Sequence, residues 1–168
     1  MTKIRECIQA DIDVMFDIIN DAAIAYKGHI PDDCWHEPYM PLEHLEEEIG
    51  AGIRFFGYEE DGELLGIMGI QDVKGITLFR HAYVRTAHRN RGIGGQLIQH
   101  LMMIATRPVM IGTWKTASWA IKFYEDHGFV LVDEATKNKL LKKYWTIPVR
   151  QIETSVVLVQ AGSKYLKK

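Results

Sequence analysis

The sequence predicts a single α/β domain in which helices cover both faces of one mixed, mostly antiparallel sheet. The chain has 168 residues, of which 47% are hydrophobic and 25% charged, which suits one domain with its own core. β-rich runs follow one another over residues 53–86, and helical and strand-like runs then alternate to about residue 160. A meander followed by alternating helices and strands is typical of a mixed sheet.

Composition and charge argue against several classes of protein. The net charge of −2 argues against general nucleic-acid or membrane binding. No apolar run approaches the ~20 residues that span a bilayer, and the first residues, MTKIRECIQADID, lack the apolar region of a signal peptide. With Cys7 and Cys34 as the only cysteines, we expect a reducing, cytoplasmic setting. The histidines have no metal-ligand spacing, so no metal site is expected.

The first fifty residues predict two helices joined by an irregular segment. After an apolar start at 4–8, apolar side chains recur at helical intervals over 10–26 and predict the first helix. Residues 27–41 carry three prolines and several aromatic side chains without periodicity, and we expect this segment to form a lid. LEHLEEEIGAG, residues 42–52, predicts a short second helix that ends at its glycines.

Residues 53–86 predict a three-stranded antiparallel meander. IRFFGYEE and LLGIMGIQDV flank Asp61-Gly62, which is a strong hairpin signal. ITLFRHAYVR, residues 76–85, supplies the third run. The remaining runs predict, in chain order, a helix closed by Pro108, a strand at 109–114, a helix capped by a left-handed Gly128, a strand, a short helix and a last strand at 151–160.

The stretch RNRGIGGQL, Arg89 to Leu97, lies between a strand and a helix and indicates an anion site. Free N–H groups and the helix dipole point at one place there, and nearby arginines suit several phosphate charges. Alternatively, the glycines only allow close helix packing. No Lys-Ser or Lys-Thr follows the last glycine, which excludes a Walker P-loop, and Leu97 replaces the third glycine of a dinucleotide fingerprint.

Two motifs carry a resemblance to a known family. Arg89 to Gly94, RNRGIG, matches the R/Q-x-x-G-x-G/A acyl-CoA signature of the GNAT superfamily of N-acetyltransferases. Ala120 to Phe129, AIKFYEDHGF, resembles the A-I-x-F-Y-E-x-x-G-F helix of the same family. The element order is similar from about residue 4 to 159, and the match is tight over 82–129. The resemblance implies one GNAT domain over 1–168 whose fourth and fifth strands, at about 76–86 and 109–114, splay apart.

The resemblance also implies acetyl-CoA as co-substrate. The N–H groups of residues 91–95 would hold the pyrophosphate, the strand end at 83–85 would hold the pantetheine, and an N–H near Val84 would hold the thioester oxygen. Many relatives have Asn where this chain has Ala117, so Thr116 or Ser118 either substitutes or only caps the helix. The expected cofactor-binding residues are Tyr83, Val84, Arg85, Arg89, Arg91, Gly92, Ile93, Gly94, Gly95 and Ser118.

The resemblance assigns the acid or hydrogen-bond donor for the leaving thiolate to Tyr124. Spacing alone fits an aromatic side chain that packs with Phe123 on the sheet equally well. No cysteine in the motifs suggests a covalent intermediate, so we expect direct transfer in a ternary complex. The family's strand-borne Glu or His positions are Leu78 and Arg80 here, which leaves the general base open. The candidates are Asp72, His36, Glu37 and a water chain.

For the acceptor, we expect Arg80 to face the pocket and bind a carboxylate or similar anion. Strand alternation puts His81 on the face opposite to Arg80, so we expect it to point away from the acceptor and to be part of the core or to support the site indirectly. Trp35 and Tyr39 of the lid are expected to choose the acceptor, with Trp145 on the far side, although the tryptophans fit core or dimer contacts equally well. These features favour a small amine or amino-acid-like acceptor.

Two other functions remain open at this stage. The same fold could bind acyl-CoA without catalysis, as a sensing module, or acetylate a protein N-terminus or peptide. Members of the family are often dimers, so the resemblance allows a homodimer.

Overall fold

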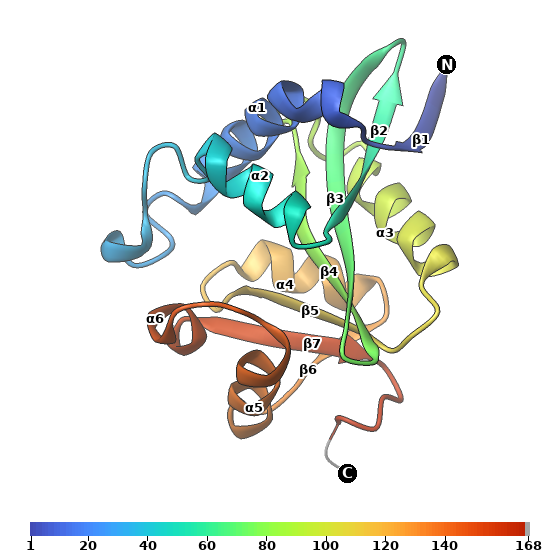
Figure 1. Cartoon of the computed structure of the whole chain (residues 1–168). Helices are drawn as coiled ribbons and strands as arrows, with labels where there is room; N and C mark the ends of the chain where they lie inside the picture. Colours follow the sequence, from blue (N-terminus) through green and yellow to red (C-terminus); the bar gives the residue numbers. More distant parts are fainter. Residues whose placement is uncertain (167–168) are drawn as a thin grey trace.

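The computed structural model describes residues 1–166, which form one seven-stranded sheet in the order β1-β2-β3-β4-β5-β7-β6 (Figure 1). The strands β1 to β7 are Thr2–Glu6, Arg54–Glu60, Glu63–Val73, Ile76–Val84, Val109–Trp114, Phe129–Leu131 and Ser155–Gln160. The helices α1 to α6 are Ile12–Ala23, Leu42–Gly50, Ile93–Ile104, Ser118–Asp126, Glu134–Tyr144 and Val149–Glu153. No helix within the described residues is long and apolar enough to cross a membrane.

The pairing confirms the expected mixed sheet. Strands β1 to β4 are successive antiparallel neighbours, β4 and β5 are parallel, and β7 pairs antiparallel with both β5 and β6. The meander expected over residues 53–86 is therefore present as β2, β3 and β4. The single parallel pair requires a crossover, which α3 provides on one face of the sheet.

Helices cover both faces because alternate strand residues point to opposite sides. Helices α3 and α4 pack with one set of strand residues, which includes Phe56, Met68 and Phe79. The other face carries α1 and α2 over Phe55 and Ile67, and farther along it carries α5. Helix α1 buries its apolar stripe at intervals of three and four residues, as the periodicity predicts: Met15, Ile18, Ile19, Ala22 and Ala23.

Strands β4 and β5 separate along most of β4. They are paired only from Thr77 to Phe79 on β4, opposite Val109 to Ile111 on β5. Beyond this point β4 continues to Val84 and β5 to Trp114 without further pairing between them. The backbone edges that face the gap are thus left without sheet partners, and the expected splay of the fourth and fifth strands is confirmed.

A β-bulge in β4 overturns the simple alternation expected for His81. Gly69 on β3 pairs with Arg80, but Ile67 pairs with Tyr83, so two β4 residues stand opposite Met68 alone. His81 has a φ of 57°, in the left-handed region that side chains rarely adopt. The bulge turns His81 toward Glu48 of α2, on the same side as Arg80, so the expectation that His81 points away from Arg80 is wrong.

The end of the chain contains a helix that the sequence pattern did not indicate. Residues 149–153 form α6, whereas a strand was expected from residue 151. Pro148 precedes the helix at the position where a missing N–H costs nothing, and β7 begins only at Ser155. Gly128 ends α4 with a φ of 90°, as expected for a left-handed cap.

Candidate functional site

A cavity of about 540 Å³ lies beside the end of β4 that is not paired with β5, at the N-terminus of α3. Its walls come from the end of α1, from β4, from the glycine loop and from α4. Eight of the residues expected to bind a cofactor or act in catalysis line it: Tyr83, Val84, Arg89, Gly92, Ile93, Gly94, Gly95 and Tyr124. Its volume is in the range of small-molecule sites.

The N-terminus of α3 opens on this cavity without a side-chain cap. Gly92 stands at the N-cap with a φ of 79°, and no side chain accepts a bond from the first turn. The first helical bond runs from the N–H of Gln96 to the carbonyl of Gly92, 3.0 Å away. The N–H groups of residues 93–95 therefore have no helical partners, and the first turn carries no acidic residue. This end of the helix is suited to an anion.

The glycines of the loop also bring α3 close to α4. A Cβ at Gly94 would lie 3.2 Å from the Phe123 ring, and a Cβ at Gly95 would lie 3.1 Å from Nε2 of His127. Both alternatives weighed for these glycines, helix packing and an anion site, are therefore compatible with the structure. His127 lines the cavity and its Nδ1 lies 2.7 Å from the carbonyl of Phe123, a role that its position at the end of a helix did not reveal.

The cationic side chains of the loop divide into two groups. Arg89 lines the cavity, together with His88. Arg91 turns to Glu60, with Nη2 donating across 2.7 Å, and Arg85 donates from Nε to the carbonyl of Leu64 across 3.2 Å. Neither Arg85 nor Arg91 lines the cavity, and the exposed Ser118 does not line it either. Contacts between these three side chains and a cofactor stay predictions.

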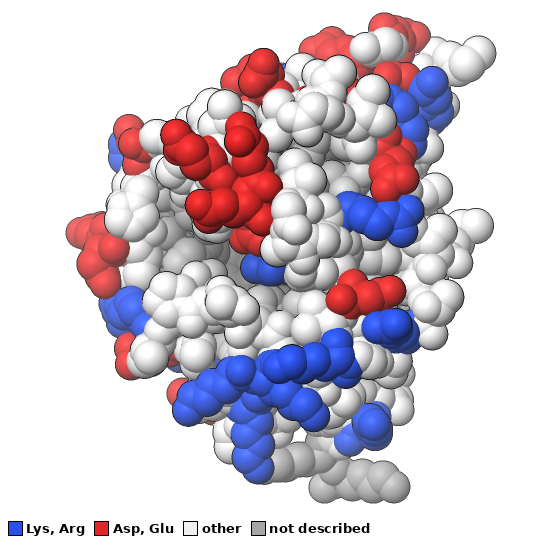
Figure 2. Space-filling model, in the orientation of Figure 1, with Lys and Arg blue, Asp and Glu red and all other residues white. Residues whose placement is uncertain are grey.

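A second cavity, of about 100 Å³, adjoins the first. The two share four lining residues: Tyr26, Ala82, Tyr83 and Tyr124. The smaller cavity also reaches Arg80, Tyr39 and Trp145. Figure 2 shows a hollow on this face between acidic side chains over α2 and basic side chains over α5, which are Glu43, Glu46, Glu47, Lys139, Lys142 and Lys143. The two cavities, the larger and the smaller chamber, thus adjoin along residues that include Tyr124.

Tyr124 is held at the junction by burial and ring packing. The residue is 8% exposed, and its ring packs edge-on against Phe123 with 5.3 Å between the centroids. Burial raises the pKa of its hydroxyl, so the group stays protonated through the neutral range and can donate a hydrogen bond. Tyr124 therefore both packs on the sheet side of α4 and presents a donor where the cavities meet.

Of the residues expected at the acceptor pocket, Arg80 and Tyr39 line the smaller cavity. Arg80 is largely buried, and its Nη1 donates to Gln71 across 3.2 Å. Tyr39 accepts a hydrogen bond of 2.8 Å from Nε1 of Trp114. Trp35 lies behind Tyr39, with 5.8 Å between the ring centroids, and does not line the cavity. The segment 27–41 therefore reaches the pocket through Tyr39, and its role as a lid stays a prediction.

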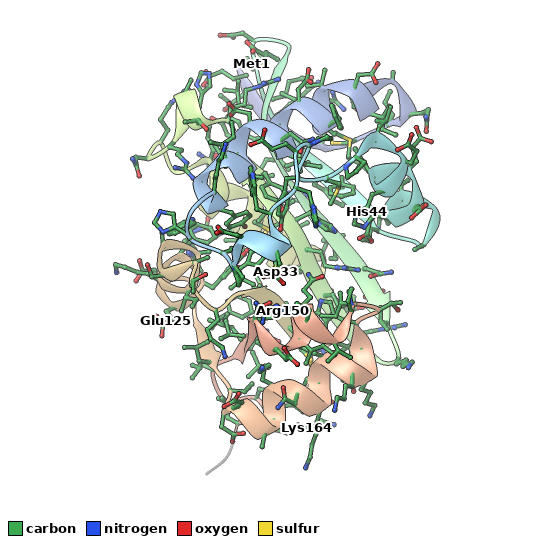
Figure 3. All side chains as sticks on the ribbon, turned by 90° about the vertical axis from the view of Figure 1, so that its left-hand side faces the viewer. Met1, Asp33, His44, Glu125, Arg150 and Lys164 are labelled. Carbon is green, nitrogen blue, oxygen red and sulfur yellow. The ribbon has the colours of Figure 1, made fainter. Side chains whose placement is uncertain are left out.

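The segment 27–41 is linked to α6 by an ion pair. Asp33 accepts two hydrogen bonds from Arg150, of 2.9 and 3.1 Å, and Figure 3 shows the two side chains facing one another. Lys27 and Glu37 form a second exposed ion pair within the segment. Exposed pairs of this kind contribute little to stability, so the packing of Tyr39 is the stronger restraint on this segment.

Glu48 of α2 is a largely buried carboxylate, near Arg80 and His81 of the smaller cavity, that sequence reasoning missed. Its oxygens lie 3.2 Å from His44, 3.4 Å from His81 and 3.6 Å from Arg80. Burial alone would raise the pKa of Glu48, but the contacts with His81 and Arg80 outweigh it and lower the pKa to about 2. For Arg80, burial lowers the pKa of the guanidinium by more than the charge of Glu48 raises it. Only the i,i+4 spacing from His44 marked Glu48 in the sequence.

Because of Glu48, the free energy of unfolding should decrease as the pH falls below 4.5. Because its pKa falls from 4.5 to about 2 on folding, the stabilisation is present above pH 4.5 and is lost as the pH falls toward 2. We expect Glu48→Gln to flatten the decline of the free energy of unfolding between pH 5 and pH 3, measured by urea titration. A decline as steep as that of the wild type would contradict this coupling.

The three side chains considered as a general base lie outside both cavities. Asp72 accepts a hydrogen bond of 2.6 Å from the hydroxyl of Thr77, at the far end of the β3–β4 hairpin. Glu37 is exposed and paired with Lys27, and His36 is exposed. None of them is positioned at the junction where Tyr124 lies.

Comparison with known proteins gives one family match, over about half of the chain. Residues 51–131 match the family model of the acetyltransferase (GNAT) domain. Peptidyl-lysine N-acetyltransferase YiaC of Escherichia coli (strain K12) is 23% identical over 151 residues, which are 90% of this chain and 99% of the relative. This match is weak in identity but spans nearly the full length of both chains.

Solved structures of low sequence identity share the fold. PaiA N-acetyltransferase of Thermoplasma acidophilum, in complex with coenzyme A, superposes with a TM-score of 0.72 at 17% identity. A GNAT-family acetyltransferase of Staphylococcus aureus superposes with a TM-score of 0.71 at 17% identity. In each case 95% of this chain and 98% of the other are covered. Residues 51–131 therefore match the GNAT acetyltransferase domain, and the structural relatives show that the chain as a whole shares their fold.

Proposed function

We propose that the protein transfers an acetyl group from acetyl-CoA to the primary amine of a small, amino-acid-like acceptor by direct attack in a ternary complex. One observation carries this proposal: the chamber under the uncapped end of α3 and the chamber that contains Arg80 meet at Tyr124. Binding of coenzyme A by a structural relative supports the same reading of the larger chamber.

In this proposal the larger chamber holds acetyl-CoA. The free N–H groups of residues 93–95, with the charge of Arg89, bind the pyrophosphate. The unpaired edge of β4 as far as Val84 pairs with the pantetheine amides, because those backbone groups lack a β5 partner. This arrangement directs the thioester toward Tyr124 at the junction, and an N–H near Val84 stabilises the developing oxyanion.

Tyr124 then assists departure of the thiolate. A thiol has an ordinary pKa near 8.5 and a tyrosine near 10, so full proton donation is uphill by roughly 2 kcal/mol before any help from the site. Burial raises the pKa of Tyr124 further, which makes a hydrogen bond to the developing thiolate the main contribution and leaves complete transfer to follow bond cleavage.

Arg80 selects the acceptor in this proposal by binding its carboxylate. We expect Arg80→Ala to raise the KM of a carboxylate-bearing amine by about 10- to 100-fold, the effect of losing one charge-assisted hydrogen bond. The control is the matching amine without the carboxylate, for which the variant and the wild type should differ little. Equal effects on both amines, in steady-state kinetics, would remove this role from Arg80.

Acetylation of peptides is the second candidate, because the relative YiaC is described as a peptidyl-lysine N-acetyltransferase. The smaller chamber, with about 100 Å³ and a largely buried Arg80, favours a compact acceptor, but a hollow lies on the surface between α2 and α5. A lysine side chain entering from that hollow is the peptide version of the same chemistry.

The deciding experiment is release of thiol from acetyl-CoA across amino acids, polyamines, aminoglycosides and lysine-containing peptides. The proposal expects release with small carboxylate-bearing amines, and acetylated acceptor by mass spectrometry. Release with peptides alone would favour the second candidate. Tight acetyl-CoA binding with no release for any acceptor would favour a non-catalytic acyl-CoA-binding module.

A further inference from the structure

His81 combines a strained backbone with a position at the acceptor chamber. Its φ of 57° lies at the bulge of β4, and its side chain, 14% exposed, lines the smaller cavity together with Arg80 and Tyr124. A histidine in the left-handed region persists only where the surrounding structure holds it, and such positions cluster at functional sites. The ring centroids of Phe55 and Tyr83 lie 6.0 and 6.5 Å from the centroid of the imidazole, so these two rings restrict its movement.

One nitrogen of this imidazole is buried and unsatisfied. Among residues 1–166, Nε2 of His81 is the only buried side-chain polar atom without a hydrogen-bond partner. It lies 3.4 Å from Oε1 of Glu48, close enough for charge attraction but without hydrogen-bond geometry. A buried unsatisfied group is costly, so its retention calls for an explanation other than packing. A small rotation toward Glu48 would give Nε2–H a carboxylate acceptor.

We propose that His81 is the general base that takes a proton from the acceptor ammonium, and that Glu48 is the positioning residue that holds its Nε2–H. With Nε2 turned to Glu48, Nδ1 is the nitrogen that remains for the chamber. This inference rests on the proposed function, because it assigns a base to that reaction.

The proton balance of the reaction is then complete. The bound ammonium gives one proton to Nδ1 of His81, and the neutral amine attacks the thioester carbonyl carbon. The C–N bond forms, the C–S bond breaks, and the sulfur takes a proton from Tyr124. The second proton of the new amide nitrogen restores the hydroxyl of Tyr124, and His81 returns its proton to solvent. One ammonium and one acetyl-CoA thus give one amide, one free thiol and one released proton.

The charged groups around His81 favour the neutral ring that a base requires. Burial lowers the pKa of His81, and the charge of Arg80 and the nearby His44 lower it further, whereas Glu48 raises it. The net effect is a pKa below the ordinary value near 6.5, so the imidazole is unprotonated at neutral pH. An amine with a pKa near 10.4 is almost entirely protonated there and needs such a base.

The test is the pH dependence of kcat/KM in the wild type and in His81→Gln, with whichever amine supports turnover. For the wild type we expect a plateau that begins below neutral pH, because His81 supplies the base. For His81→Gln we expect a loss of about 100-fold or more at pH 7. The rate of this variant should rise tenfold per pH unit toward the pKa of the amine, which then supplies its own neutral form.

Two further variants separate catalysis from structure. His36→Gln removes an exposed histidine that lines neither cavity, and it should leave kcat within about twofold of the wild type, because surface changes are usually mild. Glu48→Gln removes the contact that raises the pKa of His81, so the acid limb of the profile should move to lower pH. Retention of acetyl-CoA affinity by all variants, measured by calorimetry, shows that each is folded.

The outcomes distinguish this inference from the function on which it rests. An active wild type together with a His81→Gln variant of equal rate and equal pH profile would overturn the role of His81 and leave the proposed function intact. A wild type that releases no thiol with any amine would overturn the proposed function first.

Discussion

Replacing Tyr124 by Phe is expected to lower kcat by about 100-fold or more while acetyl-CoA affinity changes little. The substitution removes one hydroxyl at the junction of the two chambers and keeps the ring that packs on Phe123. The hydroxyl acts only once charge develops on sulfur, so its loss should affect kcat more than KM. Steady-state rates of thiol release measure kcat, and calorimetry measures the affinity for acetyl-CoA.

The matched control is Tyr144→Phe. Tyr144 is a buried tyrosine of α5, 6% exposed, that lines neither chamber. Removing its hydroxyl should leave kcat unchanged, so any general effect of losing a buried tyrosine hydroxyl would appear in both variants. An unimpaired Tyr124→Phe enzyme would mean that the thiolate leaves without help from this group.

Placing a carboxylate at Gly94 is expected to weaken acetyl-CoA binding by about 100-fold or more, because two like charges a few ångström apart repel by a few kcal/mol. The residue lies in the first turn of α3, where an introduced acid would also accept the N–H groups that the pyrophosphate needs. The same acid complements the helix dipole, whereas crowding against Phe123 is shared by any side chain at this position, so we expect Gly94→Asp to melt at a temperature equal to or above that of Gly94→Asn. Calorimetry with coenzyme A and a thermal melt measure the two effects.

Gly94→Asn is the control for size. The amide has nearly the shape of the carboxylate and meets the same neighbour, since any Cβ at Gly94 lies 3.2 Å from the Phe123 ring. The part of the affinity loss that is common to both variants reports this crowding, and the excess in Gly94→Asp reports charge. Equal losses in the two variants would show that the end of α3 does not hold an anion.

Local patterns in the sequence predicted most of the elements and the larger chamber. The hairpin signal at Asp61-Gly62, the helical period of α1 and the cap at Gly128 each depend on nearby residues, and each is confirmed. Arg89, the glycines of the loop and Tyr124 lie in two short motifs that line one cavity. Here neighbouring residues in the sequence are also neighbours in the site.

The smaller chamber could not be predicted in the same way because it depends on contacts between distant segments. The bulge in β4 is a matter of register with β3, and it reversed the side on which His81 was expected. Glu48 reaches Arg80 and His81 from α2, more than thirty residues earlier in the chain. No local pattern encodes that approach, which follows from how α2 packs beside the sheet.

The central claim is that acetyl-CoA and the acceptor meet at Tyr124 from two chambers. A crystal structure of the protein with coenzyme A and an amine that supports thiol release tests this claim most directly. We expect the pyrophosphate on the N–H groups of residues 93–95, the sulfur within hydrogen-bond reach of the Tyr124 hydroxyl, and the amine beside His81 and Arg80. A sulfur directed away from Tyr124, or an amine outside the smaller chamber, would contradict the account.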